Sequence, residues 1–183
     1  LGLLVAGAML PRVSPGAMLT LGDFVGAPGQ ESYAWLRVDD ATGLASMQFQ
    51  ANYDRNLLTF ISATNHTGTL GAQFDLDVEP GDGFVIVRLF RDTSLESGAG
   101  DLVTMRFGVN TGAEEGMSSA LVLAETDLAN HYGANLRWKS PVITEDAIFS
   151  VSADASSDLL FVRNAGFGGT VTGDDSGLYP AGR

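Results

Sequence analysis

The 183-residue chain contains no cysteine and only one lysine, Lys139, against nine arginines. The lack of cysteine excludes disulfide bonds, thiolate nucleophiles and cysteine-ligated zinc or iron–sulfur sites. Basic residues are also few: 10 Lys and Arg against 22 Asp and Glu give a formal net charge of −12. This balance argues against nucleic acid or an anionic membrane surface as the partner, since both require a basic footprint.

Long hydrophobic runs are missing as well. The most apolar stretch, Leu1–Leu10, is too short to span a bilayer, so we predict no membrane span. Its Ala6-Gly7-Ala8 triplet fits the end of a secretory signal, and Pro11 and Pro15 bracket a short linker behind it. We expect this apolar segment to pack on its own domain or in a groove of a neighbouring molecule.

Alternation of apolar and polar residues dominates the rest of the chain. Between positions 45 and 53 every second residue is apolar, which predicts a strand with one buried and one solvent-facing side. Comparable segments separated by turn residues recur up to position 151, and only 124–130 hints at helical spacing. We therefore predict an all-β fold, a two-sheet jelly-roll-type β-sandwich of eight or nine strands. Its core is expected to contain Met47, Phe49, Val103, Met105 and Phe107.

The order of several short segments resembles that of bacterial and archaeal cohesin domains. In chain order they are Pro28-Gly29, Gly43-Leu44, Phe49 to Asp54, Gly83–Phe90, Ser97–Leu102 with Met105–Phe107, and Ile143–Val151. Arg55 departs from the pattern, because the family usually has proline there. The resemblance covers residues 17–151, and leaves 1–16 as an apolar segment with a linker and 152–183 as a C-terminal extension. It implies a non-catalytic binding module of extracellular or cell-surface assemblies.

Two modes of assembly follow from these features. The favoured hypothesis is homopolymerisation into a surface filament, in which the N-terminal segment of one copy adds as a donor strand to an open sheet of the next. The side chains available to fill the neighbouring copy are Leu1, Leu3, Leu4, Val5, Met9 and Leu10. The alternative is a monomeric module that binds a dockerin-like protein or a polysaccharide through a sheet face near Ser46, Gln48 and Gln50.

No motif in the sequence indicates a catalytic site. His66 and His131 are expected in surface loops, and no Gly-x-Ser-x-Gly motif is present to organise a catalytic triad. Pairs of carboxylates suit glycoside hydrolysis in principle, but in an acidic chain they are more often solvated. The pairs are Asp75/Asp77, Glu114/Glu115 and Asp174/Asp175. We predict no enzymatic activity.

Calcium is the one cofactor for which the sequence offers candidates. The spacing of three carboxylates resembles that of ligands to a hard cation, although alternation within a strand produces the same spacing. They belong to Asp75, Asp77 and Asp82. Asn65 begins an Asn-His-Thr sequon and is therefore a candidate glycosylation site.

Aromatic residues and the C-terminal extension have two interpretations each. The pairs Tyr33/Trp35 and Tyr132/Trp138 suit stacking on sugar rings, but core or sheet-edge packing is the more frequent use of such residues. The extension contains an apolar stretch, Asp158–Arg163, followed by a tail rich in glycine. We favour a surface strap for the extension over a dedicated binding segment.

Overall fold

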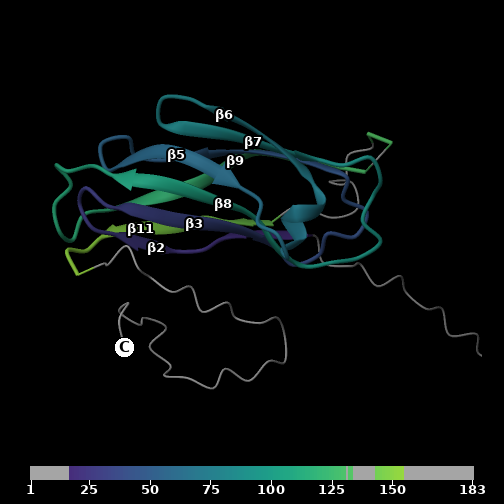
Figure 1. The fold of residues 1–183 in the computed structure, drawn as a ribbon, viewed down its shortest axis with the longest axis horizontal. Coiled ribbons are helices and arrows are strands. Elements are labelled where there is room, and N and C mark those ends of the chain that lie inside the picture. Colours follow the sequence, from purple (N-terminus) through teal and green to yellow (C-terminus); the bar gives the residue numbers. More distant parts are fainter. Residues whose placement is uncertain (1–16, 131, 134–142, 155–183) are drawn as a thin grey trace, which may run out of the picture.

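The computed structural model describes residues 17–130, 132–133 and 143–154, which form a two-sheet β-sandwich (Figure 1). The elements are β1 (Met18–Leu21), β2 (Phe24–Gly26), β3 (Glu31–Val38), β4 (Ser46–Asn52), β5 (Leu58–Thr64), the 3-10 helix η1 (Leu70–Gln73), β6 (Asp75–Pro80), β7 (Phe84–Phe90), β8 (Gly100–Val109), β9 (Ser118–Ala129), β10 (Ile143–Glu145) and β11 (Ala147–Val151). The predicted all-β sandwich is confirmed. Within the described residues, no helix has the length and apolarity needed to cross a membrane.

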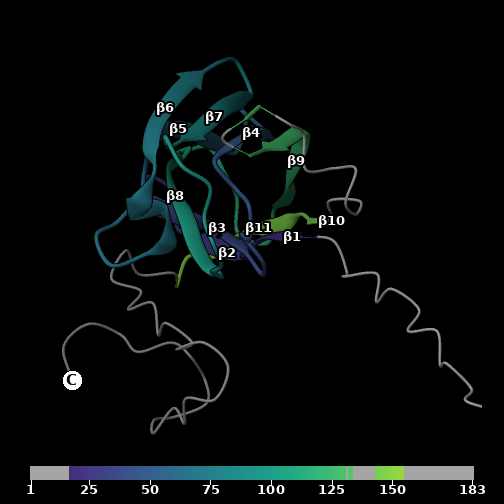
Figure 2. The same cartoon turned by 90° about the vertical axis from the view of Figure 1, so that its right-hand side faces the viewer.

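The two sheets enclose a single core. One sheet has the strand order β10-β1-β3-β8-β5 and the other has the order β2-β11-β9-β4-β7-β6. Figure 2 looks along the sandwich and shows the strands arranged around this core. All paired neighbours are antiparallel except β1 with β10 and β2 with β11, which are parallel.

The described residues contain more strands than the eight or nine predicted, because the first and last strands are each divided in two. Both cross from the five-stranded to the six-stranded sheet, the first at Gly22 and Asp23 and the last at Asp146. A carboxylate satisfies a backbone donor at each crossing: Asp23 Oδ1 accepts from Ile148 N at 2.7 Å, and Asp146 Oδ1 accepts from Leu123 N at 2.8 Å. The number of strands exceeds the prediction because each strand that crosses between the sheets is counted once in each of them.

Alternation places the core as the sequence predicts. The inward residues of β3 and β4 are buried at every second position. Phe107 lies at the centre of an aromatic cluster, with ring centroids 5.9 Å from Phe24, 5.3 Å from Tyr53 and 5.7 Å from Phe60. The five predicted core residues are all at most 2% exposed and are thereby confirmed: Met47, Phe49, Val103, Met105 and Phe107.

Two segments differ from the sequence-based expectation. Residues 124–130, whose sequence shows some helical spacing, continue β9 as a strand almost to their end. Its pairing with β4 shifts register between Gln48 and Gln50, so that an extra residue of β9 lies opposite Phe49 as a β-bulge. The sequence also predicts a strand over residues 71–78, but the first of these residues belong to η1 and β6 begins only at Asp75.

Several sequence-based candidates lie outside the described residues. They are the N-terminal segment with Leu1, Leu3, Leu4, Val5, Met9 and Leu10, together with His131, Trp138, Asp158–Arg163 and the pair Asp174/Asp175.

Candidate binding surface

The outer side of the six-stranded sheet carries the three β4 residues proposed from the sequence. Ser46, Gln48 and Gln50 alternate with buried residues of β4 and point away from the core, each partly exposed. Strand β4 lies between β9 and β7, with β6 beyond β7 at the sheet edge. The three side chains therefore lie near the middle of an open sheet surface.

The strand register gives these residues their neighbours. Gln48 is paired with Arg88 on β7 and with Asp127 on β9, while Gln50 is paired with Ile86 and Ala124. We use the name β4 face for this outer surface, which comprises Ser46, Gln48, Gln50 and Asn52 of β4, Ile86, Arg88 and Phe90 of β7, Asp77 and Glu79 of β6, and Ala124 and Asp127 of β9. It combines amides, apolar side chains and charges on a nearly continuous sheet.

Arg88 joins three strands of the β4 face. Its Nε donates to Gln48 Oε1 at 2.9 Å, and its two terminal nitrogens donate to Asp77 Oδ2 at 3.0 Å and to Glu79 Oε2 at 2.8 Å. The hydrogen bond to Glu79 and then that to Asp77 raise the pKa of Arg88 above its ordinary value. The pair of acceptors on β6 and the amide on β4 thus hold the guanidinium in one position.

Acidic groups flank the β4 face on both sides. Asp77 and Glu79 line the β6 side, with side chains 57% and 61% exposed. Glu125 and Asp127 are exposed on the β9 side, and Glu125 has a φ of 48°, an uncommon conformation for a residue other than glycine. The bulge in β9 turns Glu125 outward, and so adds an acidic side chain beside the β4 face.

The candidates predicted from the sequence do not include Arg88, Glu125 or Asp127. The outward position of Arg88 could have been read from the alternation of Phe84–Phe90, where Val85, Val87 and Leu89 are the buried set. Glu125 could not be placed by alternation, because the bulge reverses the facing of the residues behind it.

The calcium candidates Asp75, Asp77 and Asp82 lie on β6 and in the turn that follows it. Asp75 and Asp77 share the exposed side of β6 because they are two residues apart on a strand. Asp77 is paired with Arg88, and Asp82 is paired with Arg55 in the neighbouring turn. Throughout the described part of the chain, no three His, Cys, Asp or Glu side chains group closely enough to hold a metal ion. The spacing thus reflects strand alternation and arginine pairing.

Asn65, the glycosylation candidate, has a structural role. Its Nδ2 donates to the carbonyl oxygens of Gly71 at 3.0 Å and Phe74 at 2.7 Å, which ties the end of β5 to both ends of η1. Attachment of a glycan to this nitrogen would replace one of the two hydrogens. The geometry therefore argues against glycosylation of the folded protein at Asn65.

The remaining candidates lie on the opposite sheet or in turns. Tyr33 and Trp35 point outward from β3 and are partly exposed, so neither of them packs in the core. Trp35 instead packs on Gly22, where a Cβ would overlap the indole ring. The exposed His66 lies 3.3 Å from the Thr64 hydroxyl, and Tyr132 is 82% exposed. The pair Glu114/Glu115 lies in an exposed turn.

Comparison with solved structures identifies the architecture. The non-cellulosomal cohesin of the archaeon Archaeoglobus fulgidus is 18% identical, with a TM-score of 0.63 over 74% of this chain and 91% of that one. The sixth cohesin of Acetivibrio cellulolyticus scaffoldin B, solved with a Cel5 dockerin, is 16% identical, with a TM-score of 0.62 over 75% of this chain and 99% of that one. A type I cohesin from a cohesin–dockerin complex of Clostridium thermocellum is 10% identical, with a TM-score of 0.61 over 76% and 95%.

Sequence comparison gives the family. No curated protein sequence matches the chain significantly. The family model described as the cohesin domain matches residues 18–149, which include every strand of the sandwich except the last two residues of β11. The chain therefore belongs to the cohesin domain family, a family of non-catalytic binding modules.

Proposed function

We propose that this cohesin domain binds a dockerin-like protein through its β4 face. The observation that carries the proposal is the row of outward amides on β4, in the open sheet of a cohesin fold. Arg88 fixes one of these amides, that of Gln48, by a hydrogen bond. Both bacterial cohesins compared above were solved in complex with dockerins, which supports a partner of the same kind.

The chemistry of the β4 face suits a protein partner. The amide of Gln50 donates to Asn52 Oδ1 at 2.7 Å, which leaves its own carbonyl oxygen available to a partner. Ile86 and Ala124 lie on either side of Gln50 and offer apolar contact. Because sheet side chains are held in place before binding, association would cost little ordering entropy. The acidic flanks favour a partner that brings positive charge.

Such a module would act outside the cell or on its surface, as a component of a larger assembly. Family membership supports this setting, in which cohesins join other proteins without chemical change. Substrate turnover is no part of the proposal, since cohesin domains are non-catalytic binding modules.

Binding to a panel of dockerin domains, including the Cel5 dockerin, tests the proposal by isothermal titration calorimetry. We expect at least one dockerin to bind, and Gln50→Arg to weaken that binding at least about tenfold through steric overlap at the centre of the face. Thr64→Arg, on the exposed side of the other sheet, is the matched control and should bind normally. Equal loss in both variants, or binding only to soluble polysaccharide in affinity gels, would contradict the proposal.

Self-association by the donor strand Leu1–Leu10 is a second proposal. It rests on the apolar character of this segment and on the linker behind it, both outside the described residues. In that mechanism, backbone hydrogen bonds supply affinity and alternate side chains fill pockets of the next copy. Deletion of residues 1–10 separates the two proposals, because it would abolish self-association and leave dockerin binding unchanged.

A further inference from the structure

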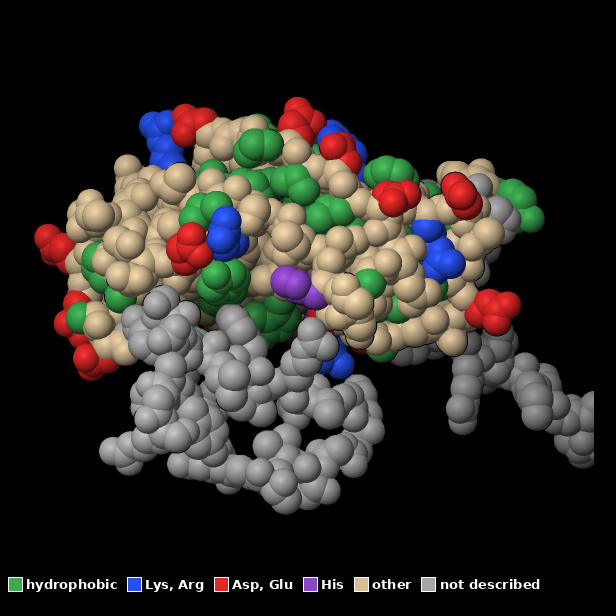
Figure 3. Space-filling view, viewed as in Figure 1, with side chains coloured by type: hydrophobic (Ala, Val, Ile, Leu, Met, Phe, Trp, Pro, Cys, Tyr) green, Lys and Arg blue, Asp and Glu red, His purple; other side chains and the backbone are tan. Residues whose placement is uncertain are grey.

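The outer side of the five-stranded sheet carries a second surface, opposite the β4 face. Trp35 and Thr104 are paired across β3 and β8, and Tyr33 is paired with Arg106. All four are partly exposed. We name this surface the Trp35 platform and include in it Tyr33, Trp35, Thr104, Arg106, Asp101 and Arg37. Figure 3 looks onto it and shows basic and acidic side chains beside hydrophobic ones over β8 and β3.

The aromatic side chains of the platform are held in place. Gly22 leaves room for the indole of Trp35 to pack directly on the backbone of the sheet crossing. The hydroxyl of Tyr33 donates to Glu31 Oε2 at 3.1 Å, and the same oxygen accepts from Arg106 at 3.3 Å. The result is a fixed apolar strip that faces away from the core.

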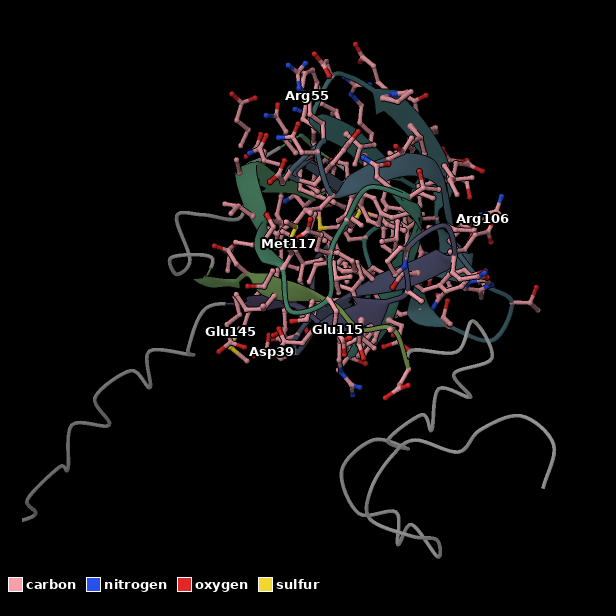
Figure 4. The ribbon with its side chains drawn as sticks, turned by 90° about the vertical axis from the view of Figure 1, so that its left-hand side faces the viewer. Asp39, Arg55, Arg106, Glu115, Met117 and Glu145 are labelled. Atoms are coloured by element: carbon pink, nitrogen blue, oxygen red, sulfur yellow. The ribbon has the colours of Figure 1, made fainter. Side chains whose placement is uncertain are left out.

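Charges of opposite sign mark the two ends of this strip. Arg106 lies at one end, and Figure 4 shows it projecting from the outer side of the sheet. Its Nε is shielded from solvent and has no hydrogen-bond acceptor, so one donor of the guanidinium is unsatisfied. Asp101 lies at the other end, 4.0 Å from Arg37. Arg106 and Asp101 are five residues apart on β8, a span of about 17 Å.

The described chain ends close to the Arg106 end of the strip. After β11, Ser152 N donates to Gly26 O at 3.1 Å, so this end lies against β2. Strand β2 in turn lies against β3, since a Cβ atom placed at Gly26 would be 3.0 Å from the Cβ of Ser32. Only β2 therefore separates this end of the chain from β3. Figure 1 shows β11, β2 and β3 side by side here. The three residues between Asp154 and Asp158 let these two Cα atoms lie up to about 13 Å apart, enough to pass β2.

The sequence beyond this point matches the platform in length and charge. Asp158 and Arg163 enclose four consecutive apolar residues, Leu159 to Val162. Extended, these six residues span about 17 Å, the same as the distance from Arg106 to Asp101. A chain that leaves β11 reaches the Arg106 end first, which brings Asp158 to Arg106 and Arg163 to Asp101.

We propose that residues 158–163 of the chain dock on the Trp35 platform of the same molecule. Leu159 to Val162 cover Tyr33 and Trp35, and the carboxylate of Asp158 pairs with the guanidinium of Arg106, whose side chain is 40% exposed. The strap occupies one sheet of the sandwich. It thereby leaves the β4 face, on the other sheet, as the surface open to a partner.

Engineered disulfides test the proposal in the full-length chain, which has no cysteine of its own. Thr104→Cys is combined with Leu160→Cys in one protein and with Phe161→Cys in a second, because alternate residues of an extended strap face the sheet. We expect at least one pair to form an intrachain disulfide at least tenfold faster than the control pair Gln48→Cys with Leu160→Cys. Equal rates for all pairs, or disulfides only between molecules, would overturn the proposal.

Hydrogen exchange supplies an independent test. Trp35→Ala should speed exchange of the amides of residues 159–162 at least tenfold, whereas Phe90→Ala, on the β4 face, should leave them unchanged. Arg106→Glu should have the same effect as Trp35→Ala, and adding Asp158→Arg should reverse it. Exchange that is fast in the unmodified chain and insensitive to all these variants refutes docking. Neither test involves the β4 face as a binding site, so the dockerin proposal stands or fails separately.

Discussion

Arginine side chains connect neighbouring strands on both outer surfaces of the sandwich. Arg88 links β7 to β4 and β6, while Arg106 links β8 to Glu31 on β3. A guanidinium has five donors in a planar arrangement and can serve two strands at once, which a lysine ammonium does less well. The excess of arginine over lysine therefore has a structural use here. The many acids beyond these pairs remain available to set the charge of the surface.

Phe49 illustrates how much one core residue contributes. It is fully buried on β4 and lies opposite the bulge of β9. Phe49→Ala should lower the free energy of unfolding by about 3–5 kcal/mol, because it removes the ring and leaves a cavity. Urea denaturation followed by circular dichroism measures this value. Ser46→Ala, on the outer side of the same strand, should change it by less than about 0.5 kcal/mol, and comparable losses in both variants would place Phe49 outside the core.

Asn65 should prove to be a structural residue that carries no glycan. Asn65→Ala removes the side-chain donor of two carbonyl oxygens, that of Phe74 and that of Gly71, which keeps its bond from Phe74 N. It should cost about 1–3 kcal/mol of stability. Thr67→Ala removes the sequon but keeps the amide, so its stability should equal that of the unmodified protein. Thermal unfolding of both variants and the intact mass of the protein provide the readouts. A glycan mass removed equally by both substitutions would show that Asn65 is modified.

At the scale of the element, the alternation of apolar and polar residues predicts which side chains of a strand face the core only where the strand has no bulge. In β9, Leu121 and Leu123 face the core, and unbroken alternation would turn Glu125 inward and Leu128 outward. The bulge instead exposes Glu125 and buries Leu128, which avoids the cost of an unpaired buried carboxylate. Sequence reasoning found the strand but not this shift, and so missed an acidic residue beside the binding surface. It located Ser46, Gln48 and Gln50 because β4 itself keeps its period.

The division of the first and last strands between the two sheets could not be predicted from the sequence, for a different reason. A crossing between sheets keeps the strand conformation on both sides and changes only the pairing partner. The local signals are weak: Gly22 with Asp23 in the first strand and Asp146 in the last. Their roles become apparent only when Ile148 and Leu123 are seen to donate to the two carboxylates. Pairing across more than a hundred residues is a property of the whole fold.

Helix η1 depends on close contact with β8, and Gly71 makes that contact possible. A Cβ at Gly71 would overlap the carbonyl oxygen of Leu102, a backbone atom that cannot move independently. Gly71→Ala should therefore displace η1 and cost about 1–3 kcal/mol. Gly112→Ala is the control, since nothing lies within 4 Å of its Cβ position, and it should change stability by less than about 1 kcal/mol. Thermal unfolding that ranks the two variants equally would contradict the contact.

For the molecule as a whole, the two sheets have different surface chemistry. The β4 face carries amides and acids around Arg88, whereas the other sheet presents the apolar Trp35 platform. A sandwich with one core can assign its two outer surfaces to separate tasks, because alternation lets the outward residues vary without disturbing the inward ones. The proposed division assigns one surface to a partner protein and the other to the chain's own extension.

Deletion of residues 1–10 tests the donor-strand mechanism in the whole molecule. The buried core of the described residues extends from Leu19 to Val151, so the shortened chain should fold with an unchanged midpoint of thermal unfolding. If the intact protein forms filaments in negative-stain images, the shortened one should remain monomeric by light scattering. Val5→Asp should act in the same way, because a carboxylate buried in the next copy would have no partner. Dockerin binding through the β4 face should survive both changes. Filaments that persist after the deletion, or a shortened chain that fails to fold, would exclude the donor strand and leave dockerin binding as the sole mode of assembly proposed for this chain.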